Sequence, residues 1–183
     1  MRPGNGNRER QVKLDEQAHA WMRQALELAA QGLASGEAPI GSILVARDGC
    51  IIGSGHNTMH RTGNVILHAE IAALNAAAGK VPPGTRGLTL VSTLEPCVMC
   101  TGAAMEAGID HIVYGLQAPV DCGFSRVRPP ESPDANMPTI AGGLMARHSR
   151  ELFLAWMDQH QHDPTRAAQR AFIVQLLGLT PVA

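Results

Sequence analysis

Apolar residues recur along the chain with spacings that predict helices and strands in alternation. Residues 13–34 place apolar side chains near a period of 3.6, which predicts an amphipathic helix that ends near Gly36. Two short apolar runs, at 40–46 and 50–53, flank the turn residues Arg47-Asp48-Gly49. This arrangement is typical of a β-hairpin.

The rest of the chain continues the alternation. The pattern predicts strands at 88–93 and 111–114, and helices at 66–78, 97–107, 144–160 and 164–178. This order favours a single α/β domain over residues 1–183, with 164–178 as an extra C-terminal helix. Residues 1–12 are polar and are predicted to be disordered. The proline-rich segment 116–138 is predicted to be a long loop.

Composition and charge narrow the class of protein. The chain has 183 residues, of which 45% are hydrophobic and 17% charged, as in globular domains that bury a core. Fifteen basic and sixteen acidic residues give a net charge of −1, which argues against a nucleic-acid partner. No apolar run is as long as a membrane span, and the N-terminus lacks the apolar segment of a signal peptide. We therefore expect a cytoplasmic protein that does not bind membranes.

Two short motifs contain the candidate chemistry, and each begins a predicted helix. They are His68-Ala69-Glu70 and Pro96-Cys97-Val98-Met99-Cys100. Cys97 and Cys100 share one helix face, and a helix N-terminus favours their thiolate forms. With His68 they make three zinc ligands, which leaves a fourth position for water, as in catalytic zinc sites. Zinc lowers the pKa of such a water toward about 7, and Glu70 is then placed to carry a proton to a leaving amine.

The pairing of H-x-E with P-C-x-x-C is typical of zinc deaminases that act on nucleobases. The chain resembles the cytidine-deaminase-like superfamily in four stretches: 37–41, 55–57, 68–71 and 93–100. The resemblance implies a three-layer α-β-α fold with a five-stranded mixed sheet. It also implies His68, Cys97 and Cys100 as zinc ligands, Glu70 as the proton shuttle, Asn57 as a substrate contact, and a homodimer.

The sequence does not single out one substrate. Residues 94–100 resemble bacterial tRNA adenosine deaminases, but the tail from Arg147 onward sums to only +1 and lacks the basic cluster expected for tRNA. The stretches 122–124 and 153–156 resemble guanine deaminases, although Ser125 and Arg126 stand where an acidic residue is common. The resemblance thus implies hydrolytic deamination of a free nucleobase, nucleoside or related amino-heterocycle (guanine-like, or another aminated purine, pyrimidine or triazine). A tRNA-specific adenosine deaminase and a catalytically silent zinc-binding partner subunit are the alternatives.

Six residues are candidates for substrate contact: Asn57, Ala69, Glu95, Phe124, Arg126 and Trp156. Five of them also have a structural interpretation. Asn57 fits a turn after the hairpin, Glu95 fits a structural hydrogen bond, and Arg126 fits a solvated loop. Phe124 and Trp156 can stack on a flat base or fill the core. The apolar last helix supports the expected homodimer if its outward face is a partner surface.

Overall fold

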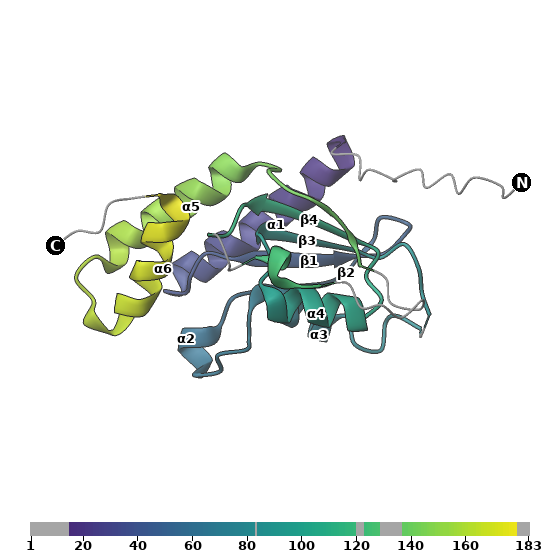
Figure 1. The fold of residues 1–183 in the computed structure, drawn as a ribbon, viewed down its shortest axis with the longest axis horizontal. Coiled ribbons are helices and arrows are strands. Elements are labelled where there is room, and N and C mark those ends of the chain that lie inside the picture. Colours follow the sequence, from purple (N-terminus) through teal and green to yellow (C-terminus); the bar gives the residue numbers. More distant parts are fainter. Residues whose placement is uncertain (1–14, 83, 120–122, 129–136, 179–183) are drawn as a thin grey trace, which may run out of the picture.

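A five-stranded mixed sheet forms the centre of the computed structural model, which describes residues 15–82, 84–119, 123–128 and 137–178 (Figure 1). Across the sheet lie β2 (Ile51–His56), β1 (Gly41–Val45), β3 (Thr89–Leu94), β4 (His111–Leu116) and β5 (Thr139–Ala141). β1 is antiparallel to both β2 and β3, whereas β3, β4 and β5 run parallel. The mixed sheet implied by the resemblance is confirmed.

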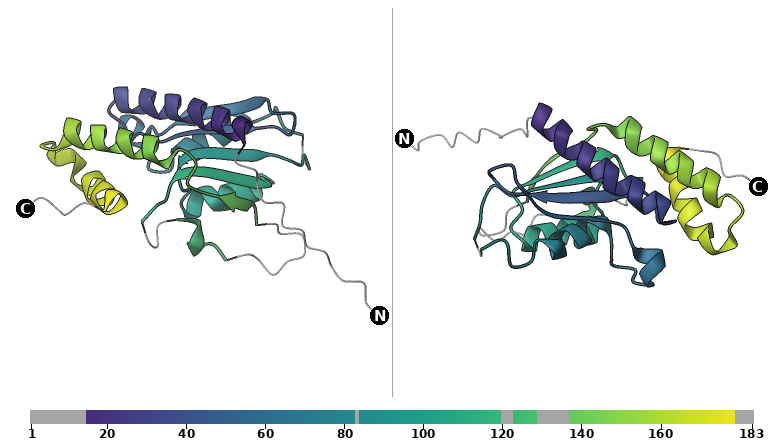
Figure 2. Two further views of the ribbon diagram at one scale, coloured as in Figure 1. Left: turned by 90° about the horizontal axis from the view of Figure 1, so that it is seen from above. Right: turned by 180° about the vertical axis from the view of Figure 1, so that it is seen from behind.

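Helices cover both faces of this sheet, as the views in Figure 2 show. One face packs against α1 (Glu16–Ala34) and α5 (Ala146–His160), and the other against α3 (Ala69–Ala76) and α4 (Val98–Glu106). At one end, α5 packs against α6 (Ala167–Leu177), which follows the short 3₁₀ turn η2 (Pro164–Arg166). These layers confirm the α-β-α architecture.

The two sheet faces differ because successive strand residues point in opposite directions. Ile43 and Val91 pack with residues of α1, while their neighbours Leu44 and Leu90 pack with residues of α3 and α4. Leu94, at the end of β3, joins a third cluster formed by α5 and α6. The C-terminal helices therefore reach the end of β3, where the second motif begins.

Close packing places α3 over β2. A Cβ atom at Gly53 would collide with the carbonyl oxygen of Ala73, and one at Gly55 would collide with the side chain of Ala72. Glycine at both positions lets the helix approach the strand closely. This contact fixes the axis of α3, and with it the position of His68 at the helix N-terminus.

The structure adds two short elements that periodicity does not predict: α2 (Met59–Thr62) and β5. The 3₁₀ turn η1 (Phe124–Arg126) lies in the described part of the long loop. The predicted disorder of residues 1–12 and the candidate match at Cys122 lie outside the described residues. Among the helices that the structure describes, none combines the length and apolar character needed to cross a membrane.

The last helix differs from its predicted role as a partner surface. Its large apolar side chains, Ile173, Leu176 and Leu177, are buried against α5 within the same chain. The residues it exposes are small or polar, such as Ala171 and Gln175. The apolar outward face was therefore a wrong expectation, because the pattern could not show that α5 already covers it. The homodimer itself stays a prediction.

Candidate metal centre and active site

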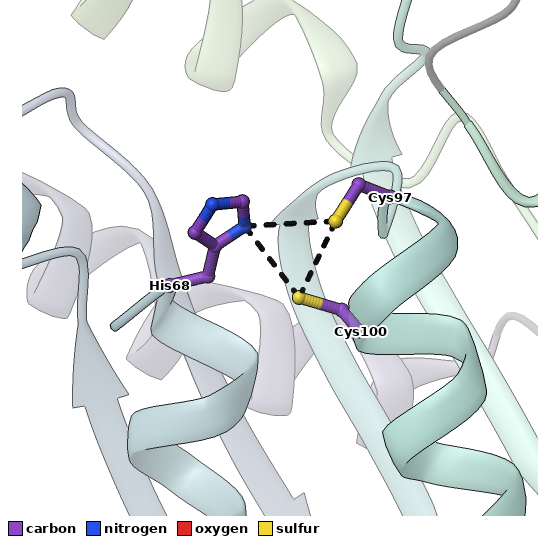
Figure 3. Close-up of side chains that lie close together, drawn as sticks. All are labelled: His68, Cys97 and Cys100. Carbon is purple, nitrogen blue, oxygen red and sulfur yellow. Dashed lines mark hydrogen bonds between the residues drawn. The ribbon is translucent and has the colours of Figure 1, made fainter. Parts of the chain in front are cut away.

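The two sequence motifs meet at the N-termini of neighbouring helices. His68 is the N-cap residue of α3 and Cys97 is the N-cap residue of α4, while Cys100 lies one turn into α4. Only residues 95–97 separate the end of β3 from the start of α4. The Thr101 amide donates to the Cys97 carbonyl oxygen at 2.9 Å. This strand-to-helix turn brings both sulfurs to face His68 (Figure 3).

The three ligand atoms form a nearly equilateral triangle. The Nδ1 atom of His68 lies 3.7 Å from the sulfur of Cys97 and 3.6 Å from that of Cys100, and the two sulfurs are 3.7 Å apart. In a tetrahedral zinc site, bond lengths of about 2.3 Å to sulfur and about 2.0–2.1 Å to nitrogen place two sulfurs about 3.8 Å apart and a sulfur and nitrogen about 3.6 Å apart. The triangle therefore has the dimensions that zinc requires.

The chemistry of the donors agrees with their spacing. The hydrogen bond between the two sulfurs lowers the pKa of Cys97 to about 4 and raises that of Cys100. The hydrogen bond with Cys97 raises the pKa of His68. One imidazole and two sulfurs, with one position left over, match the three-ligand sets of catalytic zinc sites. A structural site would supply a fourth protein ligand.

Glu70 lies beside this triangle and is 3% exposed. The Ser92 hydroxyl donates to Glu70 Oε1 at 2.9 Å, and the Cys100 thiol donates to Oε2 at 3.4 Å. Ser92 reaches the carboxyl because it lies on the β3 face that packs against α3 and α4. Burial raises the pKa of Glu70 above its ordinary value. Ser92 thus holds one oxygen of the Glu70 carboxyl, and the other oxygen faces the sulfur of Cys100.

A cavity of about 430 Å³ opens over these residues. This volume lies in the range of small-molecule sites. His68, Glu70 and Cys97 form one side, and α6 supplies the opposite side through Ala168, Gln169 and Phe172. The remaining lining residues are Ala38, Ile40, Asn57, Met59, Leu94, Glu95, Val98, Ala118 and Arg126. Residues from both ends of the sequence therefore build one pocket.

Three of the six predicted substrate contacts line this cavity: Asn57, Glu95 and Arg126. Asn57 is buried, and its Nδ2 donates to Glu37 Oε2 at 3.3 Å. Glu95 accepts hydrogen bonds from the amides of Ala118, at 2.9 Å, and Phe124, at 3.1 Å. Its carboxylate thus holds the loop after β4, in line with the structural interpretation of this residue. Arg126 is exposed at the cavity edge.

The other three candidates, Ala69, Phe124 and Trp156, are not among the residues that line this cavity, and their contact with substrate stays a prediction. Trp156 is fully buried on the core side of α5, where its ring packs on His160 with 4.6 Å between centroids. The Phe124 ring packs on Tyr114, with 6.3 Å between centroids. Ala69 is fully buried below the first turn of α3. Ala69 and Trp156 are therefore buried, whereas Phe124 is half-buried in η1.

Sequence reasoning missed Gln169 and Phe172. The pattern predicts both only as part of a terminal helix, since nothing in their local spacing indicates a binding site. Their place in the cavity depends on the turn between α5 and α6, where Arg170 donates to the carbonyl oxygens of His160 and Asp163. No local spacing encodes this long-range arrangement.

Comparison with known proteins agrees with the geometry. Residues 15–116, more than half of the chain, match the family described as the cytidine and deoxycytidylate deaminase zinc-binding region. A tRNA(Ile)-lysidine synthase of Deinococcus radiodurans is 43% identical over 136 residues, covering 73% of this chain and 23% of that protein. A tRNA-specific adenosine deaminase of Streptococcus pyogenes is 44% identical over 105 residues, covering 56% of this chain and 64% of that protein. The chain thus spans less than two thirds of either relative.

Among solved structures, a guanine deaminase from Nitrosomonas europaea superposes with a TM-score of 0.64 at 26% identity, covering 75% of this chain and 83% of that one. The expectation against a nucleic-acid partner is not supported, because a relative at 44% identity is tRNA-specific. Net charge was a poor guide, since it says nothing about where charges lie. The family match and the ligand triangle agree: the chain belongs to the zinc-binding cytidine and deoxycytidylate deaminase family, whose members are zinc-dependent hydrolytic enzymes that act on amino-heterocycles.

Proposed function

We propose that this chain hydrolyses the amino group of a free heterocycle, such as a nucleobase, a nucleoside or a related aminated purine, pyrimidine or triazine. In this reaction water adds its oxygen to the amine-bearing ring carbon, the carbon–nitrogen bond breaks, and ammonia leaves. The observation that carries the proposal is the shared cavity: the buried carboxyl of Glu70 and two residues of the ligand triangle open into one pocket of small-molecule size.

Each residue of the motifs has a role in this proposal. His68, Cys97 and Cys100 hold the zinc ion, which supplies an activated water at neutral pH when bound. Glu70 carries the proton: Ser92 fixes its Oε1, so Oε2 is the atom that takes a proton from water and gives it to the leaving amine. Asn57 accepts a hydrogen bond from the heterocycle and orients it.

The C-terminal helices support a free heterocycle. Ala168, Gln169 and Phe172 stand across the cavity from the ligands, where they would contact a small substrate directly. Each of the four arginines of the tail has a hydrogen-bond or ion-pair partner within the chain. Three donate to main-chain carbonyl oxygens and the fourth pairs with a glutamate: Arg150 with Leu177, Arg166 with Gly36, Arg170 with His160, and Arg147 with Glu151.

Adenosine in tRNA is the second candidate substrate. The 44% identity over 105 residues with a tRNA-specific adenosine deaminase supports it. A catalytically silent zinc-binding subunit is the third candidate. Glu70 argues against that candidate, because a purely structural zinc site has no use for a buried carboxyl that faces its ligands.

Ammonia release by zinc-loaded protein tests the three candidates together. The substrates are guanine, cytosine, adenine, their nucleosides, aminotriazines and a tRNA anticodon stem-loop. Glu70→Gln serves as the blank, and Glu106→Gln, an exposed carboxyl on α4, serves as the matched control. We expect release from a free heterocycle by wild type and by the control. Release from the stem-loop alone would support the tRNA candidate, and silence on all substrates would support the silent subunit.

A further inference from the structure

Two amide side chains line the cavity from opposite ends of the sequence, Asn57 and Gln169. An amide offers an oxygen that accepts and a nitrogen that donates, so its chemistry toward a ligand depends on which end is already bonded to protein. The hydrogen bonds around Asn57 and Gln169 show which end of each amide is already bonded to protein.

Asn57 presents its oxygen to the cavity. Its Nδ2 donates to Glu37 Oε2 at 3.3 Å, so the nitrogen end is already bonded. Glu37 is 1% exposed and is itself fixed by amides: Oε2 accepts from His60 N at 3.1 Å, and Oε1 accepts from Arg61 N at 2.6 Å. A carboxylate bonded in this way acts only as an acceptor, so the nitrogen end of Asn57 must face it, and Oδ1 accepts no hydrogen bond from any of the described residues.

Gln169 presents the opposite end. Arg166 Nη1 donates to Gln169 Oε1 at 2.9 Å, and Arg166 Nη2 donates to the carbonyl oxygen of Gly36 at 2.7 Å. Arg166 is 5% exposed, so its guanidinium is held in place. A guanidinium can only donate, which requires the oxygen of Gln169 to face it. The Nε2 group of Gln169 donates no hydrogen bond to any of the described residues and is the end left for a ligand.

One short segment fixes both amides. Gly36 anchors Arg166, and hence Gln169, while the adjacent Glu37 anchors Asn57. The cavity therefore has a set polarity, with an acceptor at Asn57 near β2 and a donor at Gln169 on α6. A ligand that matches both needs an N–H group on one edge and an acceptor atom, such as a carbonyl oxygen, on another.

We propose that Gln169 determines specificity: its Nε2 donates to a ring carbonyl of the substrate, so the cavity selects amino-heterocycles that also carry an oxo group. Guanine and cytosine belong to this class, whereas 2-aminopurine and 4-aminopyrimidine are the same rings without the carbonyl. A ring that carries hydrogen in place of the carbonyl oxygen presents no acceptor at that position, so the amide nitrogen is left unpaired there on binding, which costs free energy. This inference rests on the proposed function, because it names the substrate class of the same site.

Matched substrate pairs test the role of Gln169. The pairs are guanine with 2-aminopurine and cytosine with 4-aminopyrimidine. We expect wild type to prefer the oxo member of at least one pair. Gln169→Leu should lower kcat/KM for that member about ten-fold more than for its partner, as expected for one lost hydrogen bond. Gln175→Leu, an exposed glutamine on the same helix, is the control and should keep the wild-type ratio. An unchanged ratio in Gln169→Leu would overturn the proposal.

A binding measurement separates this inference from the proposed function. Calorimetry on zinc-loaded protein compares the affinity for hypoxanthine, which carries the oxo group, with that for purine, which lacks it. Neither ligand has an amino group to lose. We expect hypoxanthine to bind about ten-fold more tightly to wild type and to lose that advantage in Gln169→Leu, while zinc content and Tm stay unchanged. Equal affinities for wild type, or no binding of either ligand, would overturn the proposal even if ammonia is released. Absence of ammonia release together with the expected binding would overturn the proposed reaction alone.

Discussion

The two sides of the cavity are built in different ways. On the ligand side, His68, Glu70, Cys97 and Cys100 come from two short motifs at the starts of α3 and α4. On the opposite side, Gln169 and Phe172 come from the last helix, which is tied to the segment before β1 by the bond from Arg166 to Gly36. Local chain geometry fixes the first side, whereas tertiary contacts fix the second.

We infer from this difference that the ligand side carries out the reaction and that the opposite side selects the substrate. The ligand side needs a fixed spacing between two sulfurs, an imidazole and a carboxyl, and the first turn of a helix supplies that spacing in any fold that places the helices together. The opposite side need only present shape and polarity to a substrate. Changes on the ligand side should therefore abolish the reaction, and changes on the opposite side should shift substrate preference.

The largest expected effect comes from removing a ligand. In Cys97→Ser we expect zinc content to fall well below one ion per chain and activity to fall below detection, because a neutral hydroxyl is a poor zinc ligand. A chelator should lower the Tm of wild type by about 5–10 °C, as expected for the loss of a tightly bound ion, and should barely change that of the variant. Metal analysis and thermal melts check both results.

Cys50→Ser is the matched control, since Cys50 is exposed and distant from the triangle. It should keep full zinc content and activity. If Cys97→Ser retained one tightly bound zinc ion, the assignment of Cys97 as a zinc ligand would be contradicted. The contrast between the ligand side and the opposite side of the cavity would then lose its basis.

A smaller effect is expected from Ser92→Ala. The hydroxyl holds Glu70 Oε1 at 2.9 Å, so its loss leaves one carboxyl oxygen without its partner and lets the side chain turn. We expect kcat to fall about ten-fold with little change in KM or zinc content, because the group that moves the proton is misplaced while the substrate still binds. Steady-state kinetics with metal analysis measures this. A rise in KM at constant kcat would place Ser92 in substrate binding instead.

The smallest effect is expected from Glu95→Gln. Both carboxylate oxygens of Glu95 accept main-chain hydrogen bonds, from Ala118 and Phe124, and the amide retains only one accepting oxygen. We expect KM to rise a few-fold, because the loop after β4 keeps one of its two hydrogen bonds to this side chain. Kinetics on the preferred substrate checks this, with Glu151→Gln on the exposed side of α5 as control. A loss as large as that of Glu70→Gln would show that Glu95 acts in the chemistry itself.

The sequence predicted the ligand side well for a physical reason. The i to i+3 spacing of Cys97 and Cys100 and the motif at His68 encode their geometry locally, and the structure brings these atoms within 3.7 Å of one another. The sheet was also largely predictable, because its central strands are short apolar runs. β5 was missed since three residues carry no measurable alternation.

The opposite side could not be predicted because it depends on contacts between distant residues. The pattern of α5 showed that Trp156 lies on an apolar face, but not that this face meets α6 rather than the substrate. Likewise, Gln169 is one of several polar residues on a terminal helix, and only the bond from Arg166 singles it out. Predicting such a residue requires the tertiary fold.

The most direct test of the account is ammonia release by zinc-loaded wild type and Glu70→Gln, with zinc content measured on the same samples. We expect release from a free amino-heterocycle by wild type. We expect a loss of at least about 100-fold in Glu70→Gln, with one zinc ion per chain retained, because the variant keeps the ligands and lacks only the group that moves the proton. Turnover by Glu70→Gln at the wild-type rate would contradict the account.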